Sequence, residues 1–306
     1  MDPSLSPTPS KIPLLMVFIF LFISMVIGAL LGSLLSLLMS QVWGISLTAM
    51  QEINTQTPLS ERQFFRTVNL LSHLATFTLP ALITAYLFYK REWLSKLHLA
   101  KSPTLFFIFG GIIWLLLSFP FTQVSFWVNQ QLPLPEWATS LENQAEDMIA
   151  GLLTMNSIWE LFFTLAVMAL VPAIGEELVF RGIIQRELVK RMKYPHAAIW
   201  IASFIFSAFH FQFEGFIPRL ILGAVLGYLY YWSRNLWIPI LIHLFYNGMQ
   251  IVAYYLYKAE MENLSGQTEM PNLWLGLGSL LFLIAGGWYL SQHKITQDET
   301  LYERIG

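Results

Sequence analysis

Two carboxylates and a guanidinium lie inside a long apolar stretch, and this feature constrains the fold most. The sequence Gly-Glu-Glu-Leu-Val-Phe-Arg-Gly at 175–182 carries Glu176, Glu177 and Arg181, within an apolar segment that covers about 157–190. An ionisable group at the centre of a bilayer costs at least ~2.5–3.5 kcal/mol, and such groups usually face a protein interior or a water-filled cavity. We therefore expect a polar site around this segment.

The composition is that of a polytopic membrane protein. Of the 306 residues, 56% are hydrophobic and 12% are charged, against ~25% charged residues in soluble domains. The net charge of -2 and the absence of a basic patch interleaved with aromatic residues argue against nucleic acid as a partner. A chain without cysteine has no disulfide, no thiolate metal site and no cysteine nucleophile.

The apolar segments predict an all-α fold, a transmembrane helix bundle of about eight spans. The first span is too long for a signal peptide, so we expect it to be retained, and we expect the fourth to be kinked or tilted near Pro172 and Gly175. The predicted spans are 13–42, 67–89, 104–128, 157–190, 196–211, 216–232, 236–257 and 273–290. The predicted domains are a disordered tail at 1–12, N-terminal transmembrane helices and loops at 13–150, a core at 151–257, and a last transmembrane helix with a C-terminal tail at 258–306.

The positive charges predict the orientation of these spans. Short cytoplasmic loops are enriched in Lys and Arg, which places the loops at 90–101 and 186–193 and the turn at Arg234 in the cytoplasm. Eight spans with both termini in the cytoplasm satisfy all three and place the acidic connection at 129–156 outside. Arg62 and Arg66 fall on the wrong side of this topology.

The spacing within the first motif assigns different tasks to its carboxylates. Glu177 and Arg181 are four residues apart, so on a helix they share a face and can form an ion pair. Glu176 is turned about 100° away and is free for another task, such as that of a general base. The plainer interpretation is a buried ion pair that fixes helix packing, although it leaves the second glutamate unexplained.

Phe206 and His210 lie on the next predicted span. A single intramembrane histidine is often only a hydrogen-bonded packing residue, but its position favours a role in the site. Glu176 and His210 are each fourteen residues from the cytoplasmic ends of their spans, at about Lys190 and His196, or ~21 Å along a helix. We therefore expect them to meet at one depth.

His243 and Asn247 form another pair four residues apart, and so share a helix face. Counted from Leu236, they lie ~10 Å and ~16 Å deep. Both side chains can donate hydrogen bonds to a developing oxyanion. The alternative is a polar clamp between helices, which membrane bundles commonly use.

The other notable residues favour packing roles. Gly223 and Gly227 form a small-xxx-small pattern typical of close helix packing. Four further polar residues have no evident partner, and we interpret them as interfacial or packing residues: His73, Glu160, His196 and Glu214.

The three motifs, Glu176-Glu177-x-x-x-Arg181, Phe206-x-x-x-His210 and His243-x-x-x-Asn247, resemble in their order the CPBP family of intramembrane proteases, also called the CAAX protease and bacteriocin-processing or Abi family. The resemblance covers about 157–257. It implies an eight-helix, glutamate-dependent endopeptidase whose site opens within the membrane. By this resemblance Glu176 and His210 would activate water, His243 and Asn247 would stabilise the oxyanion, and Glu177, Arg181 and Phe206 would support them.

Two other functions stay open at this point. Glu176, His210 and His243 could supply the three protein ligands of a catalytic zinc, although no HExxH helix is present; the leading interpretation needs no cofactor. A non-enzymatic immunity or transport protein could use the same polar core for proton or ion passage. The expected partners are membrane lipids and a membrane-associated protein or peptide substrate, lipidated or not. The expected location is a bacterial cytoplasmic membrane.

Overall fold

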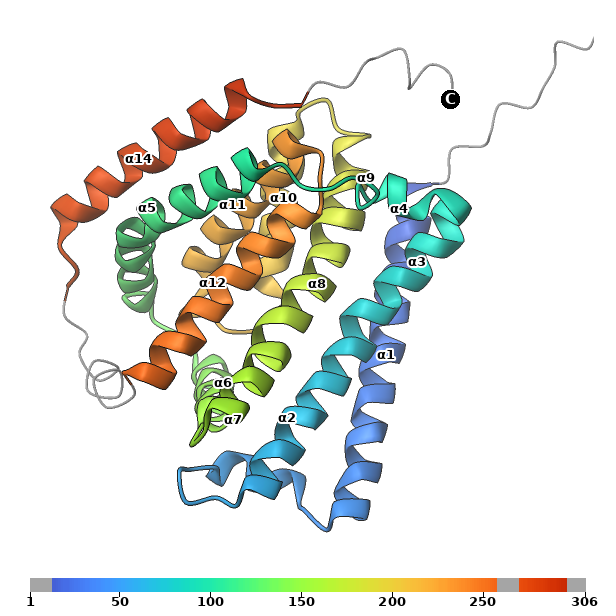
Figure 1. The fold of residues 1–306 in the computed structure, drawn as a ribbon, viewed down its shortest axis with the longest axis vertical. Coiled ribbons are helices and arrows are strands. Elements are labelled where there is room, and N and C mark those ends of the chain that lie inside the picture. The colour runs from blue at the N-terminus through green and yellow to red at the C-terminus, as the bar shows by residue number, and fades with distance from the viewer. Residues whose placement is uncertain (1–12, 258–269, 296–306) are drawn as a thin grey trace, which may run out of the picture.

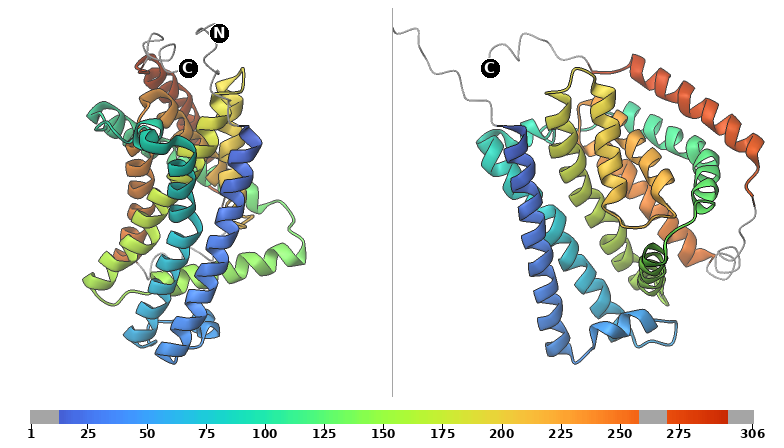
Figure 2. Two further views of the ribbon diagram at one scale, coloured as in Figure 1. Left: turned by 90° about the vertical axis from the view of Figure 1, so that its right-hand side faces the viewer. Right: turned by 180° about the vertical axis from the view of Figure 1, so that it is seen from behind.

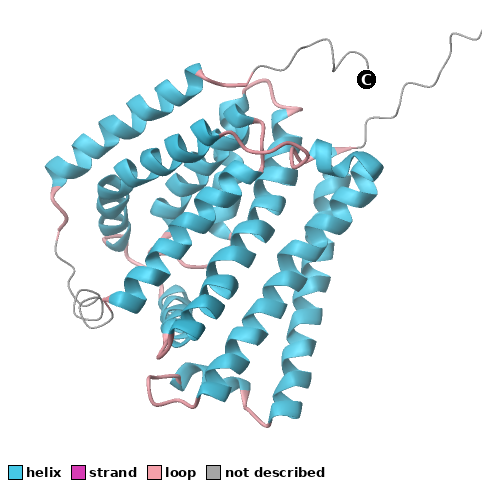
Figure 3. Cartoon of the chain, in the orientation of Figure 1, coloured by secondary structure: helices cyan, strands magenta, loops and turns pink. Residues whose placement is uncertain are grey.

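The computed structural model describes residues 13–257 and 270–295. All regular secondary structure in these ranges is helical, which confirms the predicted all-α class (Figure 3). The predicted tail at 1–12 and the end of the C-terminal tail lie outside the described residues. The α-helices are α1 (Leu14–Trp43), α2 (Leu59–His73), α3 (Leu79–Tyr89), α4 (Trp93–Lys96), α5 (Leu105–Gln130), α6 (Glu136–Leu153), α7 (Ile158–Leu165), α8 (Val171–Glu177), α9 (Arg186–Val189), α10 (Pro195–Ala208), α11 (Phe216–Ser233), α12 (Trp237–Leu256) and α14 (Leu273–Gln292).

Short π-helical segments join several of these helices into continuous rods. Leu74–Thr78 connects α2 to α3, while Ala166–Leu170 and Leu178–Gln185 lie within the rod from α7 to α9. The last rod runs from Ile158 to Val189 and matches the long fourth segment expected from the sequence. π-Helical turns are rare and occur often at functional sites.

Five helical rods among the described residues are long and apolar enough to cross a membrane. They are Leu14–Trp43, Leu59–Lys96, Leu105–Gln130, Ile158–Val189 and Leu273–Gln292. The protein is therefore an integral membrane helix bundle. α10, α11 and α12 lie where shorter spans are predicted, but they do not meet the same measure, so the count of eight stays a prediction.

The rods form two groups on either side of α8 (Figure 1). α1 packs along the α2–α3 rod, which in turn packs against α8 and its neighbouring π-helical segments. On the other side of α8 lie α10, α11, α12 and α5, and α14 packs outside on α5. Of these, α10 packs against α11, and the two helices approach closely at Gly223, where a Cβ would lie only 3.0 Å from the Ser203 side chain. The predicted packing role of that glycine is confirmed.

The basic loops gather at one end of the bundle. The backbone N–H of Leu236 donates to the carbonyl of His98 at 3.1 Å, and that of Ile295 donates to the carbonyl of Trp232 at 2.8 Å. Burial, reinforced by nearby cations such as Arg186, lowers the pKa of His98 to about 4, so this side chain is neutral at pH 7. The beginning of α1 and the end of α14 lie at this same end (Figure 1). This is the arrangement that two termini on one side require, and their cytoplasmic location stays a prediction.

The acidic connection after α5 contains a helix that the sequence analysis did not anticipate. α6 runs across the opposite end of the bundle, roughly perpendicular to the long rods (Figure 2). Its buried positions include Ala138, Glu142 and Leu152, while most of its other residues face outward. α6 therefore runs across the bundle, and it is not among the helices of the described residues that are long and apolar enough to span a membrane.

Arg62 and Arg66 are buried, which explains why they depart from the charge pattern. Both guanidinium groups donate to the carboxylate of Glu160, with Arg62 Nε and Arg66 Nη1 each 2.9 Å from its Oε2. The two arginines are 5% and 0% exposed. They thus belong to an internal ion-pair cluster rather than to an exposed loop, and the interpretation of Glu160 as lacking a partner was wrong.

Candidate active site

Glu176 and Glu177 end α8 and are both buried, at 8% and 0% exposure. Glu177 Oε1 accepts a hydrogen bond from Arg181 Nη1 at 2.7 Å, so the ion pair expected from the four-residue spacing is present. Arg181 also donates through Nη2 to the carbonyl of Gly223 at 2.9 Å. This contact fastens the charged segment to α11.

Glu176 faces away from this pair and is surrounded by three histidines from three separate rods. Its Oε1 lies 3.3 Å from His73 Nε2, and its Oε2 lies 3.9 Å from the Nε2 atoms of both His210 and His243. Oε2 is buried and has no hydrogen-bond partner. The structure therefore brings together Glu176, His210 and His243, which the sequence analysis selected, and adds His73.

Phe206 forms one wall of this site. Its ring lies 5.0 Å from the ring of His210 and 5.9 Å from that of His243, in edge-on contacts. The guanidinium of Arg181 lies over the same ring, 4.5 Å from its centroid. Phe206 therefore packs against the ion pair and both imidazoles, and its supporting role stays a prediction.

Hydrogen bonds to the Nδ1 atoms fix the protonation of both motif imidazoles. His210 Nδ1 lies 2.9 Å from the carbonyl of Phe206, and His243 Nδ1 lies 2.9 Å from Glu177 Oε1. A carbonyl and an ionised carboxylate only accept hydrogen bonds, so each Nδ1 carries the proton. In the neutral form, each imidazole therefore presents the lone pair of Nε2 toward Glu176.

Three acceptor atoms consequently converge on one small space: Glu176 Oε2, His210 Nε2 and His243 Nε2. Glu176 Oε2 lies 3.9 Å from each Nε2 atom, which is too far for a direct hydrogen bond. A single water molecule can bridge the carboxylate to an imidazole over this distance. A cation would also suit three lone pairs. The described residues contain no group of three His, Asp or Glu side chains arranged as a metal site. The 3.9 Å from Glu176 Oε2 to each Nε2 also exceeds the roughly 3.3 Å between ligands of a tetrahedral zinc with bonds of ~2.0–2.1 Å.

Asn247 lies one turn beyond His243 on α12. Its Nδ2 donates to the carbonyl of Met168 over a long 3.4 Å, the one hydrogen bond of this side chain among the described residues. The remaining amide donor is thus uncommitted. Within the described ranges, no hydrogen bond joins Asn247 to Glu176, so its catalytic role stays a prediction.

The loop that follows His210 is held from two helices outside the motifs. Glu142 of α6 accepts a 2.6 Å hydrogen bond from the backbone N–H of Phe213. Asn129 of α5 donates to the carbonyl of Phe213 at 2.8 Å and accepts from the backbone N–H of Ile217 at 2.7 Å. These bonds fix the chain between α10 and α11, and with it the turn after α10 that contains His210.

The remaining polar residues that seemed to lack partners also have them. His73 contacts Glu176, Glu214 accepts from Gln130 Nε2 at 3.1 Å, and His196 Nδ1 lies 3.0 Å from the hydroxyl of Tyr228. The assumption that His73 lacks a partner was wrong, because it contacts the central carboxylate. A sequence signal was available: His73 lies seventeen residues before Lys90, ~26 Å along a helix and so within about 5 Å of the depth estimated for Glu176.

Gly175 allows the α2–α3 rod to approach Glu176. A Cβ at this position would lie 2.7 Å from Thr78 Oγ1 and 3.1 Å from His73 Cε1. We expect Gly175→Ala to lower the free energy of unfolding by about 1–3 kcal/mol through overpacking, as measured by denaturant titration in detergent micelles.

Gly278→Ala is the matched control for Gly175, because a Cβ there meets no atom within 4 Å. It should be neutral or should stabilise its helix by up to ~1 kcal/mol. Equal effects of the two substitutions would show that close approach at Gly175 is unimportant.

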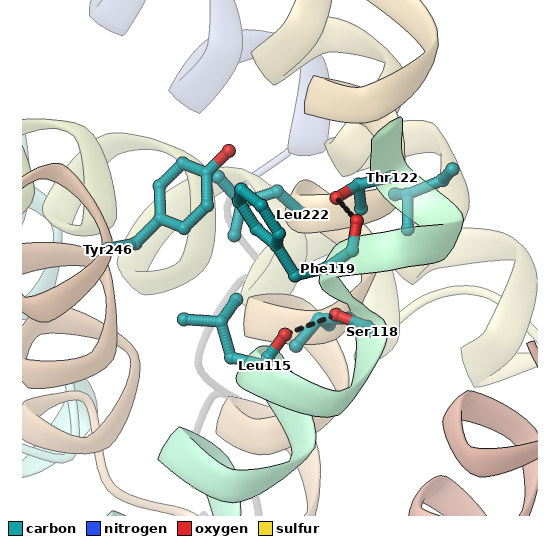
Figure 4. A pocket seen from close by; sticks show the side chains of 8 residues that line it. Leu115, Ser118, Phe119, Thr122, Leu222 and Tyr246 are labelled. Carbon is teal, nitrogen blue, oxygen red and sulfur yellow. Dashed lines mark hydrogen bonds between the residues drawn. The ribbon is translucent and has the colours of Figure 1, made fainter. Parts of the chain in front are cut away.

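A small pocket between α5, α11 and α12 lies apart from this constellation (Figure 4). The hydroxyls of Ser118 and Thr122 donate to carbonyls of their own helix, at 2.7 Å each. The pocket wall is otherwise mainly apolar, and it includes neither Glu176 nor the three histidines around it. The lining residues are Leu115, Ser118, Phe119, Thr122, Ile221, Leu222, Val225 and Tyr246.

Comparison with known proteins supports the same region. Residues 158–249 match the family described as type II CAAX prenyl endopeptidase Rce1-like. An uncharacterized protein of Bacillus subtilis (strain 168), YpbD, is 34% identical over 80 residues, which are 25% of this chain and 38% of that relative. The chain thus covers less than two thirds of this relative, and no solved structure gives a significant match. The resemblance carried by the three motifs is confirmed in the region that holds them: residues 158–249, which include all three motifs, match the Rce1-like family model.

Proposed function

We propose that this protein is an intramembrane endopeptidase that hydrolyses a peptide bond with a water molecule activated by Glu176. The observation that carries the proposal is the unpartnered Oε2 of buried Glu176, which faces two imidazole Nε2 atoms at 3.9 Å each. The Rce1-like match supports an endopeptidase of this class.

In the proposed reaction, water lies between Glu176 Oε2 and an imidazole Nε2, donating a hydrogen bond to each. Glu176 takes a proton as the water oxygen attacks the scissile carbonyl carbon. The carbonyl oxygen becomes an oxyanion, the C–N bond then breaks, and the proton passes to the leaving nitrogen. The products are a carboxylic acid and an amine, which become a carboxylate and an ammonium group once the acid proton passes to the amine, and no covalent enzyme intermediate forms.

The proton on His243 Nδ1 changes the roles expected for His243 and Asn247 in stabilising the oxyanion. A neutral His243 that donates to Glu177 has no proton at Nε2, so it cannot donate to the substrate from that atom. Asn247 keeps an N–H donor in every protonation state. We therefore assign oxyanion stabilisation to Asn247, joined by His243 only when the imidazole is doubly protonated and the Glu177 carboxylate balances its charge.

A metal-dependent protease is the second candidate, favoured by the same convergence of lone pairs. A divalent ion such as zinc would be held by Glu176, His210 and His243, and it would supply an activated water and a Lewis acid for the carbonyl. The bond from His243 Nδ1 to Glu177 resembles the carboxylate–histidine pairs that orient metal ligands. The chemistry of these donors therefore fits a metal, after a contraction of the present distances.

The proposed substrate is a membrane-associated protein or peptide, because the site is built on membrane-spanning rods. The matched family is described as a CAAX prenyl endopeptidase, and we therefore include lipidated substrates in the class. The proposed location is a bacterial cytoplasmic membrane with both termini in the cytoplasm.

The test is cleavage of a membrane-embedded peptide library by the purified full-length chain in lipid, with and without a chelator. Cleavage that persists with chelator supports the metal-free mechanism. Cleavage that is lost with chelator and restored by zinc supports the metal site. If no peptide is cut, a non-enzymatic immunity or transport role replaces the endopeptidase proposal.

A further inference from the structure

His73 contacts the central carboxylate from outside the part of the chain that carries the family motifs. It ends α2, whereas the family match begins at Ile158. Its Nε2 lies 3.3 Å from Glu176 Oε1, the shortest distance between Glu176 and any of its three histidines. The polar site therefore has a fourth member on a separate rod.

Packing on both sides holds the His73 ring in place. The ring stacks on Phe77 with centroids 4.7 Å apart and planes inclined by 19°. Gly175 leaves the space that His73 Cε1 would lose to a side chain. The π-helical segment that follows directly on His73, at Leu74–Thr78, brings Thr78 to the same contact. His73 is only 14% exposed, so water competes little for the contact.

The chemistry of the two groups fixes the direction of the hydrogen bond. An ionised carboxylate accepts only, so His73 Nε2 carries the proton and donates it to Oε1. The Nδ1 atom is buried without a hydrogen-bond partner, as expected for a neutral imidazole protonated at Nε2. This bond occupies one oxygen of Glu176 and leaves Oε2 directed at the space between His210 and His243.

We propose that His73 is a positioning residue of the active site, which fixes the rotation of the Glu176 carboxylate so that Oε2 faces the reacting water. This inference rests on the proposed function of Glu176 as the general base. It implies that the site is incomplete without the α2–α3 rod, and that residues 158–249 do not contain all of the machinery.

The kinetic test compares His73→Leu with His73→Gln in the full-length protein. Leu removes the donor, whereas Gln places an N–H donor at about the reach of imidazole Nε2. We expect His73→Leu to lower kcat about tenfold or more with KM little changed, and His73→Gln to restore most of kcat. His196→Leu is the control: this exposed histidine contacts Tyr228, and its loss should leave kcat unchanged.

Two kinetic outcomes would overturn the inference. One is a kcat for His73→Leu equal to that of the wild type. The other is an equal loss in His73→Leu and His73→Gln, which would indicate a packing role for the ring. Either result leaves the proposed function intact provided that the wild type cleaves and Glu176→Gln does not.

A second readout does not depend on activity. The chain has only six histidines, so imidazole ¹⁵N NMR of the protein in lipid gives a sparse spectrum in which His73→Gln identifies the His73 signals. We expect Glu176→Gln to shift these signals and to leave those of His196 in place. Unchanged His73 signals would overturn the contact itself, even in a preparation that cleaves nothing.

Discussion

Replacing Glu176 with Gln is expected to lower kcat for peptide cleavage by about 10²–10⁴-fold, the usual contribution of a general base. The amide has nearly the same shape, but it cannot take a proton from water. The measurement is the rate of cleavage of a peptide that the wild type cuts, with thermal unfolding of both proteins in the same lipid.

Glu136→Gln is the matched control, because Glu136 is exposed at the beginning of α6, at the end of the bundle opposite the basic loops. It removes one carboxylate without touching the polar site, so kcat should not change. If Glu176→Gln is folded and cleaves at the wild-type rate, Glu176 is not the base. A loss of activity caused only by unfolding would appear as a lower midpoint of thermal unfolding.

Residue spacing predicted much of the site because a helix converts sequence distance into depth. Counting from the basic ends placed Glu176 and His210 at one level, and in the structure their side chains lie 3.9 Å apart. The four-residue spacing likewise predicted the contact between Glu177 and Arg181. Within a single helical rod and its neighbour, the 1.5 Å rise is sufficient to predict such meetings.

The same count placed His243 shallower than His210, because it started from Leu236, which is buried within the protein. His243 was estimated to lie ~10 Å deep from Leu236, yet its Nε2 reaches the same carboxylate as His210. Leu236 and Ile238 are fully buried, and the N–H of Leu236 is bonded to the loop at His98. Leu236, the residue from which the depth was counted, therefore lies inside the protein. Its burial results from tertiary packing, which the sequence pattern does not reveal.

The sequence analysis also failed to predict contacts between polar residues that lie far apart in the sequence. Arg62 and Arg66 contradicted the topology as long as they were counted as exposed loop charges, and their partner Glu160 lies 94–98 residues away. His73 is separated from Glu176 by 103 residues and belongs to no motif. The resemblance could not indicate it either, because the motifs all lie after residue 157.

Replacing Arg181 with Met is expected to produce the largest loss of stability, about 3–5 kcal/mol in the free energy of unfolding. Arg181 and Glu177 are 1% and 0% exposed, so the substitution leaves a buried carboxylate without its guanidinium. The contacts of Arg181 with the carbonyl of Gly223 and the ring of Phe206 are lost as well. Denaturant titration in detergent micelles measures the effect, and Arg91→Met, on an exposed residue of the basic loop, should change it by less than ~0.5 kcal/mol.

The double variant Arg181→Met/Glu177→Met separates stability from activity. Replacing a buried ion pair by apolar side chains of similar size is often neutral, whereas removing one partner is costly. We therefore expect the double variant to recover at least half of the stability lost in Arg181→Met. It should nevertheless stay inactive, because His243 loses the carboxylate 2.9 Å from its Nδ1 and with it the constraint that directs Nε2 at Glu176. Recovery of both properties would mean that the pair only fills space, while recovery of neither would mean that Glu177 stabilises the bundle mainly through His243.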